Sequence, residues 1–218
     1  MLVPELTVAD PKAAGRMLEC FGFVADRGVW RLGDQSLRLQ NGLPGGHGRI
    51  DHLALGVADI DAALAALLDA GLDLDPAVTP KGPGFIPEFW QDGLRYVYLS
   101  GPEGARIELC QRVTGQTKPT GHDHVGIPCT SLADMQGFFE TAGARLVASV
   151  DLRRPEGTIP VRFMGYQGGM IELYQRPAAP ISAPKSAARP GVGLWSRLLV
   201  AGLAAPLPGP EGLTLAPL

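Results

Sequence analysis

Two matching six-residue runs constrain this chain more than any other feature of its sequence. Residues 107–112 read I-E-L-C-Q-R and residues 171–176 read I-E-L-Y-Q-R, so a glutamate, Glu108 or Glu172, stands between two branched apolar residues in each. Side chains of a β-strand alternate between the two faces of a sheet, so each glutamate is expected to point away from its apolar neighbours. A carboxylate on the inner face of a sheet is costly unless it is paired or binds a metal.

A second pair of matching runs lies upstream. Residues 51–57 read D-H-L-A-L-G-V and precede Glu108, whereas residues 123–127 read D-H-V-G-I and precede Glu172. The chain therefore contains two repeats that each supply one histidine and one glutamate at similar places. Internal repetition of this kind should be identified before any single element is assigned, because it decides the fold.

The repeats predict a metal site with four ligands and with Glu108 and Glu172 in catalytic roles; the ligands are His52, Glu108, His124 and Glu172. Two imidazoles and two carboxylates suit a borderline divalent ion, namely Ni, Co, Mn, Fe or Zn. Open positions on such an ion act as a Lewis acid on a carbonyl or on adjacent oxygens, and a glutamate that leaves the ion can serve as a general base. His122 shares a strand face with His124 and is the alternative ligand; we prefer His124 because it aligns with His52.

The composition and charge of the chain exclude some classes of binding partner. The 218 residues are 45% hydrophobic and carry a net charge of −3 without a basic block, which argues against nucleic acid and anionic membranes. No apolar run approaches the roughly 20 residues that a membrane span needs, and the first residues do not resemble a signal peptide. Three cysteines without C-x-x-C spacing fit a reduced, cytoplasmic setting.

The order of expected elements predicts an α+β fold made of tandem βαβββ modules. A strand, a helix capped by Asp10, Asp59 or Ser131, and then further strands recur along the chain. We assign residues 1–48, 49–112 and 113–176 to three modules, the third pairing with the second. We interpret residues 177–218 as a Pro/Ala-rich linker and tail, or as a truncated fourth module.

The first module lacks the ligands. Val3 stands where His52 stands in the next module, and Arg38 stands where Glu108 stands. We therefore expect this module to be structural, and either to pack with the C-terminal tail or to form a homodimer interface.

Taken in register, these motifs resemble the vicinal oxygen chelate superfamily, which includes glyoxalase I, methylmalonyl-CoA epimerase, extradiol dioxygenases and bleomycin-resistance proteins. The resemblance rests on D-H-L-A-L-G-V with its capped helix, on S-G-P-E-G-A-R-I-E-L and on the matching elements of the third module. It implies paired mixed sheets that form a cleft around one divalent metal, with ligands on the first and last strands of each ligand-bearing module.

The resemblance and the four ligands favour a glyoxalase-like isomerase or lyase. Such an enzyme would act on a small α-hydroxycarbonyl or 2-oxo compound through a metal-stabilised enediolate. Two alternatives stay open: a non-haem iron extradiol-type dioxygenase, in which one glutamate stands off the metal, and a resistance protein that binds a small molecule.

Other candidates are less specific. Arg95, Tyr98 and Arg162 lie on expected third strands and are candidate substrate-binding residues, although outward-facing arginines are an equal alternative. Glu88 and Trp90 belong either to a lid or to a packed loop. His47 is expected to be a surface residue, and Cys110 a core residue.

Overall fold

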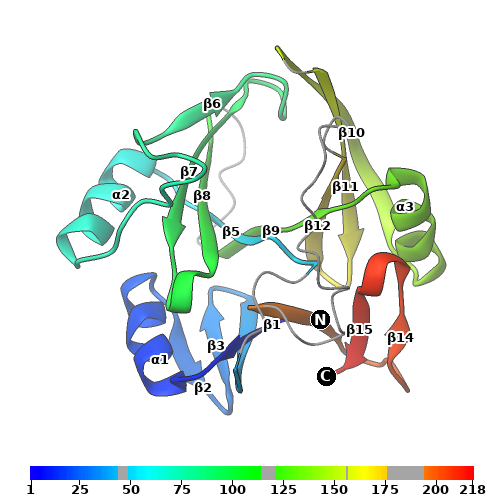
Figure 1. Ribbon diagram of the computed structural model, residues 1–218, viewed down its shortest axis with the longest axis horizontal. Helices are drawn as coiled ribbons and strands as arrows, with labels where there is room; N and C mark the ends of the chain where they lie inside the picture. The colour runs from blue at the N-terminus through cyan, green and yellow to red at the C-terminus, as the bar shows by residue number, and fades with distance from the viewer. Residues whose placement is uncertain (44–48, 114–120, 156, 176–193) are drawn as a thin grey trace.

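The computed structural model describes residues 1–43, 49–113, 121–155, 157–175 and 194–218. His47 and the expected linker at residues 177–190 lie outside the described residues. Two mixed, curled sheets and three α-helices make up the described fold (Figure 1), and the predicted α+β class is confirmed. None of the helices in these ranges has the length and apolar character needed to cross a bilayer.

The first sheet has eight strands and carries the repeated motifs. Its strands are β5 (His52–Gly56), β6 (Gly84–Ile86), β7 (Leu94–Ser100), β8 (Arg106–Arg112), β9 (Gly121–Pro128), β10 (Arg145–Arg154), β11 (Gly157–Tyr166) and β12 (Gly169–Tyr174). Their order is β10-β11-β12-β9-β5-β8-β7-β6, so β5 and β9 lie at the centre. In Figure 1 the strands β6–β8 and β10–β12 rise on either side of these two central strands.

The second sheet has seven strands and joins the start of the chain to its end. Its strands are β1 (Leu2–Val8), β2 (Val24–Asp26), β3 (Val29–Leu32), β4 (Gln35–Asn41), β13 (Trp195–Val200), β14 (Leu207–Pro208) and β15 (Thr214–Pro217). Their order is β14-β15-β13-β1-β4-β3-β2. Strand β13 pairs with β1 in the antiparallel sense, as β9 does with β5. Residues 194–218 form three strands and the 3-10 turn η2 (Pro210–Gly212), with no α-helix.

Each helix begins at a residue whose side chain accepts hydrogen bonds from backbone N–H groups of the first turn. The caps are Asp10 for α1 (Pro11–Cys20), Asp59 for α2 (Ile60–Asp69) and Ser131 for α3 (Leu132–Thr141). Helices α2 and α3 lie on the outer sides of the two walls of the first sheet (Figure 1). Their buried faces, with side chains such as Leu67 and Phe139, join the main hydrophobic core, which draws on both sheets.

A repeated G-P-E-G turn ties the two sheets together at two equivalent places. In η1 (Pro102–Gly104) the backbone of Glu103 is left-handed, and its carboxylate accepts hydrogen bonds from the amides of Ala9 (2.7 Å) and Asp10 (2.9 Å). In η2, Glu211 is also left-handed, and it accepts from the amide (2.7 Å) and the hydroxyl (2.8 Å) of Thr130. Each glutamate thus fixes the entry to a helix on the other sheet.

Candidate metal centre

Strand register brings the repeated histidines and glutamates together. In the parallel pair β5–β8, Ala54 lies opposite Glu108, two residues beyond His52, so His52 and Glu108 share one face. In the antiparallel pair β5–β9, the same Ala54 lies opposite His124, so His124 joins that face. Strand β12 adds Glu172 beside β9. All four side chains are buried.

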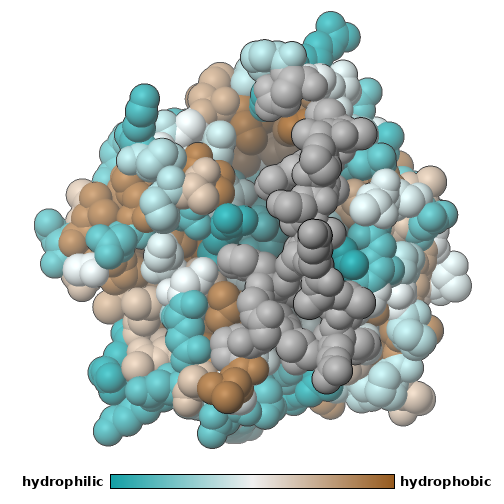
Figure 2. Space-filling view, in the orientation of Figure 1, coloured by the Kyte–Doolittle hydropathy of each residue, from teal (hydrophilic) through white to brown (hydrophobic). Residues whose placement is uncertain are grey.

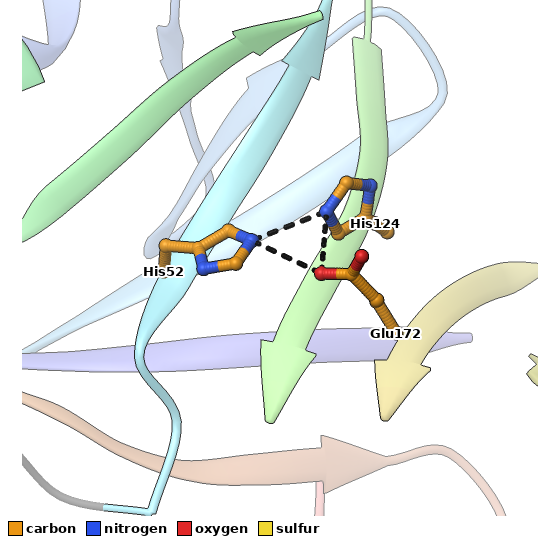
Figure 3. Close-up of side chains that lie close together, drawn as sticks. All are labelled: His52, His124 and Glu172. Atoms are coloured by element: carbon orange, nitrogen blue, oxygen red, sulfur yellow. Dashed lines mark hydrogen bonds and ion pairs between the residues drawn. The ribbon is translucent and has the colours of Figure 1, made fainter. Parts of the chain in front are cut away.

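The carboxylates of Glu108 and Glu172 each lie close to both histidines, and His52, His124 and Glu172 form one group of mutually close atoms. The Nε2 atoms of His52 and His124 are 3.1 Å apart, and Glu108 Oε2 lies 3.3 Å from each of them. Glu172 Oε2 lies 3.6 Å from His52 Nε2 and 3.4 Å from His124 Nε2. Figure 3 shows His52, His124 and Glu172 pointing toward one another from three different strands.

Two aspartates decide which ring nitrogens face the cluster. Asp51 Oδ2 lies 3.1 Å from His52 Nδ1, and Asp123 Oδ1 lies 3.3 Å from His124 Nδ1. A carboxylate at Nδ1 assigns the ring proton to that nitrogen and leaves the Nε2 lone pair free to bind. Guanidinium groups hold both aspartates, Arg106 at 2.7 Å from Asp51 and Arg112 at 3.2 Å from Asp123. Two Nε2 lone pairs therefore point at the same place.

The charges of the metal-free cluster have shifted pKa values. Burial opposes a charge on His52, but its hydrogen bonds to Asp51 and Glu108 and the charge of Glu108 prevail and raise its pKa to about 9. For His124, burial is likewise outweighed by the charge of Glu172 and by hydrogen bonds to Asp123 and Glu108, so its pKa lies well above the usual value. For Glu108, burial opposes the charge, but the two histidines lower its pKa to about 2.

Protonation of the two histidines balances the charge of the carboxylates, but the resulting N–H groups do not fit the geometry of the cluster. Two N–H groups that face each other across 3.1 Å repel, whereas one cation between the nitrogens attracts both lone pairs and both carboxylates. Glu108 Oε2 is buried without a hydrogen-bond partner of ordinary geometry among the described residues. Ligand atoms about 2.1 Å from one ion are about 3.0–3.4 Å apart at right or tetrahedral angles, close to the observed separations. The four residues therefore fit a divalent ion.

Glycine at position 126 makes room for His52. These two residues face each other across β5 and β9, and a Cβ atom on Gly126 would overlap the His52 ring. The equivalent place on β5 holds Ala54. The glycine of the D-H-V-G-I run is thus required by the His52 ring on the neighbouring strand.

A cavity of about 210 Å³ opens above the four ligands. Val78, Ile86 and Phe89 line one wall, and Leu152, Ile159 and Val161 line the other. In Figure 2 hydrophobic surface gathers in the recess near the top of the view, between the two walls. The side chains of Tyr96, Tyr98 and Tyr174 also line this cavity, so aromatic rings surround its polar floor.

Of the three predicted substrate-binding residues, the structure brings only Tyr98 into the cavity. Tyr98 lies opposite Glu108 on the paired strand and therefore shares its face. Arg95 projects from the other face of β7 and pairs with Asp61 of α2 at 2.8 Å. Arg162 precedes the inward Phe163 of β11 and donates a hydrogen bond to the carbonyl of Val161. The two arginines thus lie outside the cavity.

The structure describes the side chains of some of the remaining candidate residues. Trp90 packs against Phe163 with ring centroids 5.0 Å apart, and the guanidinium of Arg112 lies 4.0 Å over its ring, so Trp90 packs the loop. Cys110 is buried, as expected, and burial raises the pKa of its thiol well above the usual value. His122 belongs to β9, but its side chain lies outside the described part of the chain.

Sequence reasoning did not assign roles to Asp51, Asp123 or Arg154. The signal for the aspartates was present, because a D-H dipeptide opens both runs. Arg154 lines the cavity from the end of β10 and binds Glu88 at 3.0 Å across the cleft mouth. No local pattern marks that pair.

The second sheet holds an ion-pair triad at the equivalent place. Glu5 of β1 is buried, and its carboxylate accepts hydrogen bonds from Arg38 (2.7 Å) and Arg197 (2.7 Å). Arg38 and Arg197 lie opposite Glu5 on the two neighbouring strands, and Val3 lies opposite Leu199. Burial opposes the charge on Glu5, but the two arginines lower its pKa. Guanidinium groups and apolar side chains here replace the ligand set of the first sheet.

Comparison with known proteins identifies the fold. No protein-family model matches the sequence, and no curated protein sequence matches it. Among solved structures, glyoxalase I from Zea mays aligns with 82% of this chain and 68% of its own at 20% identity, with a TM-score of 0.63. Two mutants of that enzyme align over 82% of this chain and 68% and 69% of theirs, at 19% and 18% identity, with TM-scores of 0.61 and 0.63. The chain therefore shares the fold of glyoxalase I, in agreement with the resemblance found in its sequence.

Proposed function

We propose that this protein is a divalent-metal-dependent isomerase or lyase that acts on a small α-hydroxycarbonyl or 2-oxo compound. The observation that carries the proposal is the convergence of two imidazoles and two carboxylates at the floor of an apolar cavity. The ligands would be His52, Glu108, His124 and Glu172. A divalent ion bound there supplies a Lewis acid that stabilises negative charge on adjacent substrate oxygens.

The two glutamates have different roles in this proposal. Glu108 Oε2 lies 3.3 Å from both Nε2 atoms, which suits a carboxylate that stays on the ion. Glu172 lies farther from the two Nε2 atoms and its side chain is more exposed, 10% against 5% for Glu108. Glu172 is therefore assigned as the general base that removes a proton from the carbon next to the carbonyl, and Glu108 as the fixed ligand.

Tyr98 is assigned to orient the substrate. Burial, together with the nearby charges of Glu108 and Glu172, raises the pKa of its hydroxyl well above the usual value, so the hydroxyl stays protonated. A protonated phenol donates a hydrogen bond to a substrate oxygen. The apolar walls exclude water from the reacting carbon, which strengthens each electrostatic contact inside.

The test combines metal analysis with proton exchange. Protein purified without chelator is expected to hold about one divalent ion per chain, and Glu108→Ala with Glu172→Ala is expected to lose it. Metal-loaded protein is then screened with α-hydroxycarbonyl compounds, 2-oxo acids and hemithioacetals in deuterated water. We expect deuterium to enter the substrate carbon, and Glu172→Gln to abolish the exchange while keeping more metal than Glu108→Gln.

The control is Glu19→Gln, which neutralises an exposed glutamate of α1 and should leave metal and exchange unchanged. Wild-type metal affinity in the double alanine variant would refute the ligand assignment. Oxygen uptake that depends on Fe(II), without deuterium exchange, would replace the isomerase or lyase by a dioxygenase.

A further inference from the structure

The cavity above the ligands also restricts the substrate. We propose that the substrate carries an uncharged apolar arm of about one ring beside its two metal-binding oxygens, and that the site rejects compounds with a carboxylate on that arm. This inference rests on the proposed function, because it assumes that the substrate binds a metal through adjacent oxygens. It adds the chemical class of the remainder of the substrate.

The size of the cavity sets the length of the arm. An engineered apolar cavity of about 150 Å³ is known to hold benzene. The cavity here measures about 210 Å³, which leaves space for one ring and a chelating group of a few atoms. A peptide arm would extend beyond the cavity.

The walls determine the polarity of the arm. Above the ligands the cavity is lined by Phe89, Leu152, Ile159 and Val161, none of which offers a polar side-chain atom. Phe89 and Phe163 pack edge to face with centroids 5.2 Å apart, which fixes the wall against which a ring would lie. A carboxylate placed against these four side chains would lose its hydration without gaining a partner from them.

Charged groups of the lining already have partners. Asp51 pairs with Arg106, and a divalent ion would balance the two glutamate ligands. Apart from the two histidines, Arg154 is the one cation among the described lining residues, and it binds Glu88 at 3.0 Å. Glu88 Oε1 also accepts a hydrogen bond from the backbone amide of Arg153 at 3.3 Å. An anionic arm would therefore have to displace Glu88 before it found a cation.

The Glu88 contacts also bridge the mouth of the cavity. Glu88 follows β6 on one wall, and Arg153 and Arg154 end β10 on the other, so these hydrogen bonds span the cleft between the two modules. Both Glu88 and Arg154 are 27% exposed, which places the pair at the rim. The rim thus presents a neutral pair rather than a free guanidinium to an entering compound.

The experiment uses three hydroxamates, which bind a divalent ion through two adjacent oxygens. They are acetohydroxamate, which is the chelating group alone; benzohydroxamate, which adds one ring; and 4-carboxybenzohydroxamate, which adds a carboxylate. Binding to the zinc-loaded full chain is measured by calorimetry. We expect benzohydroxamate to bind at least about tenfold more tightly than acetohydroxamate, and the carboxylated compound about 100-fold more weakly than benzohydroxamate, as expected for a desolvated charge without a partner.

Glu88→Gln tests the role of the rim pair. This variant frees Arg154 and is expected to raise the affinity for 4-carboxybenzohydroxamate at least about tenfold, with little change for benzohydroxamate. The matched control is Glu140→Gln, which removes a glutamate that binds Gln136 on the exposed side of α3.

The outcomes separate the two proposals. If none of the hydroxamates binds the zinc-loaded protein, chelation at this site fails, and the proposed function fails with it. If all three bind but the carboxylated compound binds as tightly as benzohydroxamate, the metal site stands and the substrate class is wrong. An unchanged preference in Glu88→Gln would contradict the assignment of Arg154 as a neutralised cation.

Discussion

Replacing Asp51 by asparagine tests whether the D-H dipeptides orient the metal ligands. Asp51 Oδ2 lies 3.1 Å from His52 Nδ1, and its other oxygen binds Arg106 at 2.7 Å. Asparagine keeps the size of the side chain but removes the charge that strengthens the Nε2 lone pair, and its amide can turn either an oxygen or an NH₂ group toward the ring. Loss of such a partner typically lowers metal affinity about 10–100-fold, or about 1.4–2.7 kcal/mol.

The fold itself should tolerate this change. Arg106 keeps Asp75 as a partner at 3.0 Å, so the substitution does not leave its guanidinium without a carboxylate. Above pH 9, where the charge of His52 no longer stabilises the fold, we therefore expect the melting temperature of the metal-free protein to change little, and the effect to appear in metal binding. A structural role alone would instead lower stability and affinity together.

The assay is a competition titration of zinc between the protein and a chromophoric chelator at fixed pH. Asp61→Asn is the matched control, because Asp61 also accepts two hydrogen bonds from an arginine, at 2.8 Å each, but lies on the outer side of the sheet. An affinity of Asp51→Asn within twofold of wild type would refute the reasoning. An equal loss in Asp61→Asn would show that the effect is not specific to the metal centre.

Three further predictions concern stability and packing. In the metal-free protein, His52 (pKa raised from 6.5 to about 9) stabilises the fold below pH 6.5, and this contribution is lost as the pH rises through 9. Glu108 (pKa lowered from 4.5 to about 2) stabilises the fold above pH 4.5, and this contribution is lost as the pH falls through 2. The melting temperature should therefore be highest between pH 4.5 and 6.5, and a profile that does not change with pH would count against the buried cluster. Gly126→Ala should displace the His52 ring and lower zinc affinity at least about tenfold while circular dichroism stays native; unchanged affinity would contradict the overlap. Glu5→Leu leaves two arginines, 31% and 38% exposed, without their shared carboxylate and should cost about 1–3 kcal/mol in urea unfolding, with unchanged metal content; a loss below about 0.5 kcal/mol would show that the triad is dispensable.

The sequence by itself determined the repeated elements and the set of ligand candidates. Alternation along a strand is a local property, so the position of Glu108 between Ile107 and Leu109 already assigned it to the opposite face. The helix caps are local as well, because Asp59 and Ser131 bond to amides within three residues of themselves. Repetition then related the two halves of the site without any coordinates.

Strand alternation also limited the substrate-binding candidates, but only the register of pairing chose among them. Arg95 and Tyr98 are separated by an odd number of positions on β7, so they cannot share a face. The pairing of Tyr98 with Glu108 placed Tyr98 inside and Arg95 outside. The same reasoning places Arg162 outside, because its neighbour Phe163 lies opposite Glu172.

Contacts between distant segments were decided by the tertiary structure alone. Arg197 reaches Glu5 because β13 pairs with β1, and Glu88 reaches Arg154 because β6 and β10 belong to one curled sheet. Such partners are set by how sheets assemble, and the free energy of an ion pair depends on burial that no single stretch of sequence reports. The candidate ligands thus follow from local repeats, whereas the ion-pair triad of the second sheet and the contacts that bridge the rim of the cavity arise only when the strands come together.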